Sequence, residues 1–375
     1  PMVSYASTSP AVTAADDMDY LFRVVPSDAQ QGIAMATMAA AHGWQNPGII
    51  YMTNDYGAGL AAVVKGAYAQ AGMTEMCVDI GYDEDTTDFS TQVAELAASG
   101  CDSLITVTYA TDGAALMEEM AAQGIEGPTS PVCSADCPFP IMGADGIADM
   151  GFLAAFSDPT AATSVIATKP ASGTESDAKA AFEAAWAEYY VDEDGNPGNA
   201  SAAIYTHETY DAVTMIGHAA MAADCASVTC GAEVRDQLRA LGDGYSGASG
   251  THTFDQTGDV AGSGYDVCQF NPVLVQGEMT LVLLCNGNWG LFTGLTFPGA
   301  APIKIGMLNP ITGPLAQYSP GFSIAAGVAE TYMNTIQPLN FQFSVIQGDS
   351  GCDGTVAASA AQTLIDSDVV GIAGA

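Results

Sequence analysis

The chain has 375 residues, enough for two or three domains, and 49% of them are hydrophobic while only 13% are charged. That balance excludes an intrinsically disordered protein. The 43 acidic residues outnumber the 7 Lys and Arg residues, so the formal net charge is −36. So few basic residues cannot form a phosphate-binding surface, which excludes nucleic acid and disfavours anionic lipid as a partner. The acidity indicates a solubility adaptation and says little about the fold.

The chain opens with a short β-rich run, residues 2–5, and from residue 29 it alternates between helical and β-rich runs. Strands of five or six apolar residues between helices of ten to fifteen indicate βαβ units and a parallel sheet, that is, a doubly wound α/β fold. Apolar runs such as residues 104–107 are typical of strands buried on both faces. The expected helices are 29–43, 59–71, 89–99 and 113–123, and the expected strands are 48–53, 76–80 and 103–108.

The most apolar stretch, residues 279–297, is interrupted by polar residues and glycines. A membrane-spanning helix needs about 20 predominantly apolar residues, whereas an Asn-Gly step between apolar runs predicts a hairpin turn, here at Asn286–Gly287. Residues 1–4 also lack the profile of a signal peptide. We therefore expect a soluble protein.

The alternation begins again near the end of the chain. Each end resembles half of one interrupted α/β unit, because the final strand stops where a functional loop should follow. The expected strands are 302–308, 341–347 and 369–373, and the expected helices are 321–333 and 356–366.

Nine cysteines are present, and four of them form close pairs in the sequence. Neither close pair has the CxxC spacing of a zinc site, and the four histidines are not clustered near them. A disulfide framework formed in an oxidising compartment explains them better. From the spacing we predict Cys133–Cys137 and Cys225–Cys230. Cys77–Cys101 and Cys268–Cys285 are further expected pairs whose approach depends on the fold, and Cys352 should be free.

Several motifs stand in a consistent spacing along nearly the whole chain. They are Ile303-Lys304-Ile305-Gly306, residues 309–316, Gly321, Asp349-Ser350-Gly351-Cys352-Asp353, residues 3–10, residues 22–28, residues 54–59 and Tyr210-Asp211-Ala212. Together they resemble the type I periplasmic binding proteins, the leucine/isoleucine/valine-binding receptors of ABC importers.

The order of these motifs differs from that of the family, in which the segment from residue 302 comes first and residue 1 follows it. The resemblance therefore implies a circular permutant in which residues 277–301 bridge the family's usual termini, a change that nearby termini tolerate. Between the counterparts of Ala375 and Pro1 the family has a further loop and helix, with a cysteine that pairs with the counterpart of Cys352 and a serine for the ligand carboxylate. The implied fold has two doubly wound parallel-sheet lobes joined by a hinge, one of residues 1–23, 156–260 and 302–375 and the other of 24–155 and 261–301.

Ligands of open α/β sheets lie beyond the carboxyl ends of the strands, which points to the loops there. The resemblance implies that a small amino acid lies between the two lobes. Thr8 would meet both ends of the ligand, Ala6 or Ser7 would offer main-chain groups, and Asp136 would pair with the ammonium. The aromatic wall positions that the resemblance implies are Tyr56, Tyr109, Tyr210 and Tyr318.

Taken without the resemblance, several of these features have simpler interpretations. Residues 4–10 would be a polar turn, and a lone aspartate is usually a cap or a solvated residue. His207-Glu208 lacks the second histidine of a zinc motif, and residues 192–196 lack the last glutamate of a calcium loop. No metal or cofactor is expected.

The sequence holds no GxGxxG after a strand, no P-loop lysine and no GxSxG elbow, so we do not expect an enzyme. We predict a monomeric extracytoplasmic receptor, periplasmic or extracellular, with a lipid anchor on the native precursor as one option. It would bind a small amino acid or related amide by hinge closure and offer the closed form to the membrane permease of an ABC importer. Two alternatives stay open: the ligand-sensing ectodomain of a signalling receptor and, less favoured, an amide hydrolase.

Overall fold

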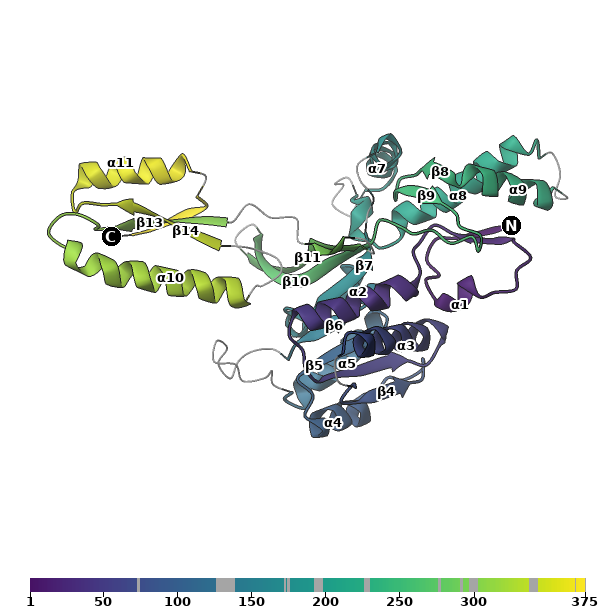
Figure 1. Cartoon of the computed structure of the whole chain (residues 1–375), viewed down its shortest axis with the longest axis horizontal. Helices are drawn as coiled ribbons and strands as arrows, with labels where there is room; N and C mark the ends of the chain where they lie inside the picture. Colours follow the sequence, from purple (N-terminus) through teal and green to yellow (C-terminus); the bar gives the residue numbers. More distant parts are fainter. Residues whose placement is uncertain are drawn as a thin grey trace. The chain divides into compact units, whose positions relative to one another are not determined.

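A computed structural model describes most of the chain, which divides into two compact units (Figure 1). The described residues of the first unit extend to Thr296, and those of the second begin at Ile303. The described residues are 1–72, 75–125, 139–171, 173, 176–191, 198–225, 230–275, 278–290, 293–296, 303–336, 343–367 and 369–374.

The first unit is built on an eight-stranded sheet with the order β12-β11-β10-β7-β6-β5-β3-β4. The segment from β4 to β7 is parallel, and β10 to β12 add an antiparallel edge. Every residue of β5 is buried, as its apolar run predicts. The strands are β3 (Pro47–Met52), β4 (Asp79–Tyr82), β5 (Ser103–Val107), β6 (Ile141–Gly143), β7 (Ile166–Pro170), β10 (Tyr265–Val275), β11 (Glu278–Gly290) and β12 (Gly294–Thr296). The predicted α/β class with a parallel sheet is confirmed.

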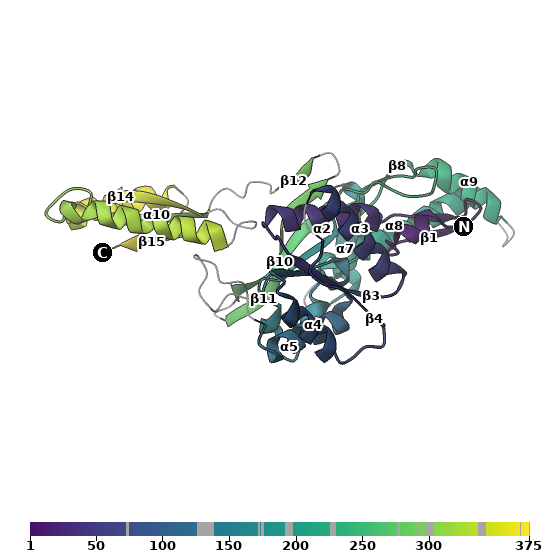
Figure 2. The same cartoon turned by 60° about the horizontal axis from the view of Figure 1, so that its bottom comes forward.

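Helices cover both faces of this sheet, with α2 and α3 on one face and α4 and α5 on the other (Figures 1 and 2). Side-chain caps set where two of them begin, since Ser27 accepts a hydrogen bond from the backbone N–H of Ala29, and Asn54 accepts one from Gly57. The N-termini of α3 and α5 follow closely on the carboxyl ends of β3 and β5. The helices are α2 (Asp28–Ala41), α3 (Asp55–Gln70), α4 (Ser90–Ser99), α5 (Ala110–Ala122) and α6 (Gly151–Ala154), with the 3₁₀ turns η1 (Asp145–Ile147) and η2 (Pro159–Ala162).

A second hydrophobic cluster of the first unit surrounds a pair of short parallel strands, β1 and β2. Val3 and Phe22 from these strands pack with Met215, Leu238 and Phe254. The elements of this region are β1 (Met2–Ser4), α1 (Pro10–Thr13), β2 (Leu21–Arg23), α7 (Asp177–Tyr189), η3 (Ala200–Ala202), α8 (Thr206–Ala222), α9 (Gly231–Leu241), β8 (Asp243–Ser246) and β9 (Thr251–Thr253).

The second unit is a parallel three-stranded sheet with β13 in the centre, and Figure 1 shows its two helices on opposite sides of the strands. Asn309, at the end of β13, is buried and donates hydrogen bonds to Ser323 and Gln347, both at 2.9 Å. The elements are β13 (Ile303–Asn309), η4 (Ala316–Tyr318), α10 (Ser319–Ile336), β14 (Phe343–Asp349), α11 (Gly354–Ile365) and β15 (Gly371–Gly374). The predicted second α/β unit is thus confirmed, while the permuted order and the two-lobe division stay predictions.

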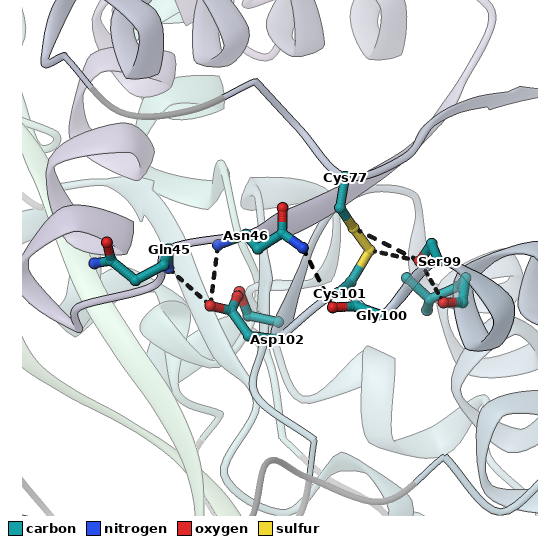
Figure 3. The surroundings of a disulfide bond; sticks show 9 residues. Gln45, Asn46, Cys77, Ser99, Gly100, Cys101 and Asp102 are labelled. Carbon is teal, nitrogen blue, oxygen red and sulfur yellow. Dashed lines mark hydrogen bonds between the residues drawn. A yellow bond between two sulfur atoms is a disulfide. The ribbon is translucent and has the colours of Figure 1, made fainter.

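Three of the predicted disulfides are present: Cys77–Cys101, Cys225–Cys230 and Cys268–Cys285. Cys352 is free and exposed, also as predicted, and the pair Cys133–Cys137 lies outside the described residues. Figure 3 shows Cys77–Cys101 beside Asp102, whose carboxylate accepts the backbone N–H groups of Gln45 and Asn46 at 2.8 and 3.0 Å. These contacts join the amino ends of β3, β4 and β5.

The predicted hairpin turn at Asn286–Gly287 is wrong. Both residues lie inside β11, where Val267 pairs with Gly287 but Cys268 pairs with Cys285, so that Asn286 is the extra residue of a β-bulge. An Asn-Gly sequence can form either a turn or a bulge. Here β11 remains paired with β10 on both sides of Asn286, so the sequence forms a bulge. Within the described residues no helix combines the length and hydrophobicity needed to cross a membrane.

Candidate functional site

A cavity of about 760 Å³ opens in the first unit where several strands and loops end. The loop after β1, the starts of α3 and α5 and the turn after β6 line it. Leu21 and residues 11, 12 and 15 add apolar surface. The principal lining residues are Ala6, Ser7, Thr8, Ser9, Asn54, Asp55, Tyr56, Tyr109, Asp145, Gly146, Ile204 and Tyr205.

The structure brings five of the predicted site residues together around this cavity, namely Ala6, Ser7, Thr8, Tyr56 and Tyr109. It does not bring Tyr210 there, because this ring packs on Phe182 with the centroids 4.8 Å apart. Tyr318 belongs to the second unit, where it is 53% exposed. Asp136 lies outside the described residues. The ligand-binding roles of all these residues stay predictions.

Two aspartates line the cavity, the exposed Asp55 and the buried Asp145, which lies at the start of η1. The carboxylate of Asp145 is held by tyrosine hydroxyl groups. It accepts hydrogen bonds from the Tyr56 hydroxyl at 2.9 Å and from the Tyr205 hydroxyl, and the backbone N–H of Gly146 donates to the Tyr56 oxygen at 3.2 Å. Burial raises the pKa of Asp145, although hydrogen bonds from Tyr205, Tyr56 and Gln31 oppose the rise. The site thus holds a desolvated carboxyl group that a cationic ligand group would stabilise in its charged form.

A second carboxyl group, that of Asp28 in the first turn of α2, lies near the cavity, since the backbone N–H of Asp28 donates to the carbonyl of Thr8, a lining residue, at 2.9 Å. Asp28 is fully buried. Burial, and then the nearby charge of Asp145, raise the pKa of Asp28 to about 8, while the Thr8 hydroxyl and Arg23 partly oppose this. Two acidic groups therefore share one buried region, and the unliganded pair favours retaining a proton.

Tyrosine rings form the wall next to Asp145. Tyr56 and Tyr109 stack with their centroids 5.4 Å apart and an interplanar angle of 8°. Burial raises the pKa of both hydroxyls and that of Tyr205, so these groups stay neutral and can donate hydrogen bonds at physiological pH. Asp112 holds the start of α5 in place, since it accepts the backbone N–H of Tyr109 at 3.0 Å and the hydroxyl of Tyr82.

Asp28, Asp145 and Tyr205 were not among the site residues predicted from the sequence. Local signals existed for the first two, because Asp28 follows a capping serine and Asp145 follows the apolar strand β6 directly. Tyr205 has φ 66°, in the left-handed region that is uncommon for residues other than glycine and concentrated at functional sites. Nothing in the sequence indicates that conformation.

Parallel strands whose carboxyl ends meet at a cavity lined by tyrosines and a buried carboxyl group are typical of a ligand-binding module. The chain belongs to the receptor family ligand binding region, whose profile matches residues 1–273. That family consists of binding regions, which confirms the prediction of a binding protein rather than an enzyme.

Solved structures of periplasmic binding proteins share the fold. The leucine-binding protein LivK of Thermotoga maritima has a TM-score of 0.59 at 20% identity, with 76% of this chain and 73% of that chain covered. A type 1 periplasmic binding protein of Bordetella pertussis has a TM-score of 0.62 at 18% identity, covering 76% and 74%. LivJ of Streptococcus pneumoniae in complex with isoleucine has a TM-score of 0.57 at 19% identity, covering 76% and 72%. None of the curated proteins compared with the chain matches it significantly. The resemblance found in the sequence is thereby confirmed at the level of fold.

Proposed function

We propose that this protein is an extracytoplasmic solute receptor that binds a small α-amino acid and offers it to the permease of an ABC importer. The observation that carries the proposal is the buried Asp145 carboxyl group at the cavity, held by Tyr56 and Tyr205. The likeness to LivK and to LivJ with isoleucine supports the ligand class, and the three disulfides are typical of an oxidising compartment.

The ammonium group of the ligand would bind at Asp145. No Lys, Arg or His is among the residues that line the cavity, so a cation from solution is what can pair with this carboxylate. An unpaired buried charge costs several kcal/mol, and a charge-assisted hydrogen bond removes most of that cost. Asp145 takes the role that the sequence analysis gave to Asp136.

The ligand carboxylate would bind the loop after β1. The backbone N–H groups of Thr8 and Ser9 donate to no acceptor in the described part of the chain, and both residues line the cavity. Successive free N–H groups form a concave anion-binding surface. The two opposite charges of an amino acid would thus each meet a complementary group of the cavity lining.

Isothermal titration of the purified protein with the twenty standard L-amino acids tests the proposal. At least one should bind, and its decarboxylated amine and deaminated acid should each bind more weakly, because each loses one of the two charged anchors. A protein that binds none of them, or binds the amine as tightly as the amino acid, contradicts the proposal.

A second candidate is the ligand-sensing ectodomain of a signalling receptor, which the family description favours. The binding site would be the same in both cases. Co-purification of the natural full-length protein distinguishes the two functions. A receptor for import should be recovered with a permease, whereas an ectodomain should be continuous with a signalling segment.

A further inference from the structure

The side chain of Arg23, at the end of β2, has no solvent-exposed area. Its guanidinium forms a two-point ion pair with Asp259, with Nε 2.6 Å from Oδ1 and Nη2 2.7 Å from Oδ2. The Thr13 hydroxyl accepts from Nη2 at 2.6 Å and donates to Asp259 at 2.7 Å. Asp259 and Thr13 therefore hold the guanidinium in one orientation.

The remaining nitrogen, Nη1, meets three successive carbonyl oxygens of the loop that lines the cavity. The distances are 3.3 Å to Ser7, 3.0 Å to Thr8 and 3.0 Å to Ser9. In a planar trans peptide unit the C=O and N–H bonds point in opposite directions. Because the carbonyls of Ser7 and Thr8 point at Arg23, the N–H groups of Thr8 and Ser9 point away from it.

A hydrogen bond from a charged donor also polarises the peptide units that accept it, which makes their N–H groups stronger donors. The arrangement thus orients and strengthens the two N–H groups that lack an acceptor among the described residues. Lysine could not replace Arg23, because a single ammonium cannot satisfy the planar two-point pair with Asp259 and the three carbonyls together.

We propose that Arg23, oriented by Asp259, is the positioning residue for recognition of the ligand carboxylate: it acts from behind the loop and never contacts the ligand. This inference rests on the proposed amino-acid function. It predicts a defect confined to one end of the ligand, which general destabilisation of the fold would not produce.

The experiment compares Arg23→Lys with the matched control Arg239→Lys, whose arginine is more exposed and pairs with Asp19. Affinities are measured for the best-bound amino acid and for its decarboxylated amine. Arg23→Lys should weaken amino-acid binding by about tenfold to a hundredfold, the range of one charge-assisted hydrogen bond, and amine binding by less than about twofold. The control should change neither affinity. Equal losses for amino acid and amine, or no loss at all, would overturn the inference.

Asp259→Asn serves as the second variant if Arg23→Lys does not fold, because the amide keeps the shape of the carboxylate but can accept only one of the two guanidinium bonds. A smaller loss of the same selectivity is expected for it. Amide NMR shifts of Thr8 and Ser9 give a readout without ligand, and they should move in Asp259→Asn and stay unchanged in Arg239→Lys. If the parent binds no amino acid, the proposed function fails, while unmoved Thr8 and Ser9 amides would separately overturn the positioning role.

Discussion

The Tyr205 hydroxyl donates a hydrogen bond to Oδ2 of Asp145, although the two residues are 60 positions apart in the sequence. Tyr205 precedes α8, whereas Asp145 follows β6, so the contact joins the region around α8 to the main sheet at the cavity. Tyr56 occupies the other carboxylate oxygen. Asp145 is therefore held in place before a ligand arrives, which reduces the ordering that binding requires.

Replacement of Asp145 by asparagine should weaken binding of the amino acid by about 2–5 kcal/mol, the cost of removing one partner from a buried charge pair. The shape of the side chain is retained, so the fold should persist. Titration calorimetry measures the effect, and Asp243→Asn, at an exposed position of β8, is the matched control. Asp136→Asn should be measured in the same series. If it loses more amino-acid affinity than Asp145→Asn, then Asp136, as expected from the sequence, binds the ammonium group.

Tyr205→Phe removes the hydroxyl that donates to Asp145 but keeps the ring. The pKa of Asp145 should rise further, because a hydrogen bond that favours its charged form is lost. Amino-acid affinity should fall by about 1 kcal/mol, the net value of a typical hydrogen bond. Tyr189→Phe, at a position that is 84% exposed, should have no effect. An unchanged affinity in Tyr205→Phe would show that Tyr56 alone suffices to hold the carboxylate.

Asp28 should make the stability of the ligand-free protein depend on pH. Its pKa is raised from 3.8 to about 8 on folding, so the folded state binds more protons than the unfolded state between these values. The contribution of Asp28 to the free energy of unfolding is fully present below the unfolded pKa. It is lost as the pH rises toward 8, by about 1.4 kcal/mol per pH unit. Asp28→Asn imitates the protonated group and should gain stability over the parent as the pH rises.

Urea unfolding of the parent and Asp28→Asn at pH 5 and pH 8 measures this difference. Asp243→Asn, the exposed control, should show no such trend. A difference between the parent and Asp28→Asn that stays constant with pH would mean that the carboxyl group of Asp28 does not retain its proton.

Asp211 should be needed for stability rather than for binding. Its buried carboxylate accepts bonds from the backbone N–H groups of Ala248 at 2.6 Å and Ser249 at 2.8 Å, and from His252 at 2.8 Å. Burial alone would raise the pKa of Asp211, but these bonds and the Ser249 hydroxyl hold it below its usual value. Asp211→Asn should lower the unfolding free energy by about 1–3 kcal/mol, because hydrogen bonds to a buried carboxylate are lost and buried donors are left without an acceptor.

The pKa of Asp211 is lower in the folded state than in the unfolded state. Its contribution to the free energy of unfolding is therefore present above the unfolded pKa and is lost as the pH falls through the folded pKa. Denaturation at pH 7 and pH 3 should therefore show a smaller difference between parent and variant in acid. A ligand affinity that falls in Asp211→Asn while the protein stays folded would contradict a purely structural role.

Removal of the Cys77–Cys101 disulfide should lower stability without affecting binding. The bond closes a loop of 24 residues, and the chain-entropy estimate for such a loop is about 3 kcal/mol. The bond joins the amino ends of the strands, whereas the cavity lies at their carboxyl ends. The double variant Cys77→Ser/Cys101→Ser should thus have a lower Tm and an unchanged Kd, as measured by calorimetry. A changed Kd would show that the two ends of the sheet are coupled.

The alternation of strands and helices, the loops that carry Thr8, Tyr56 and Tyr109, and the Cys225–Cys230 disulfide follow from the sequence alone. Cys77–Cys101 and Cys268–Cys285 were expected from it only as pairs whose approach depends on the fold. Strands and helices can be predicted because hydrophobic periodicity and helix caps involve residues that lie only a few positions apart. The loops were predicted from sequence motifs shared with a known family. The three-dimensional structure was needed to show that Asn286 is the extra residue of a bulge, that Tyr205 meets Asp145, and that Arg23 meets Asp259 across 236 positions. Each of those contacts needs two distant segments brought together by packing, and a buried charge shows no periodic pattern by which the sequence could reveal its partner.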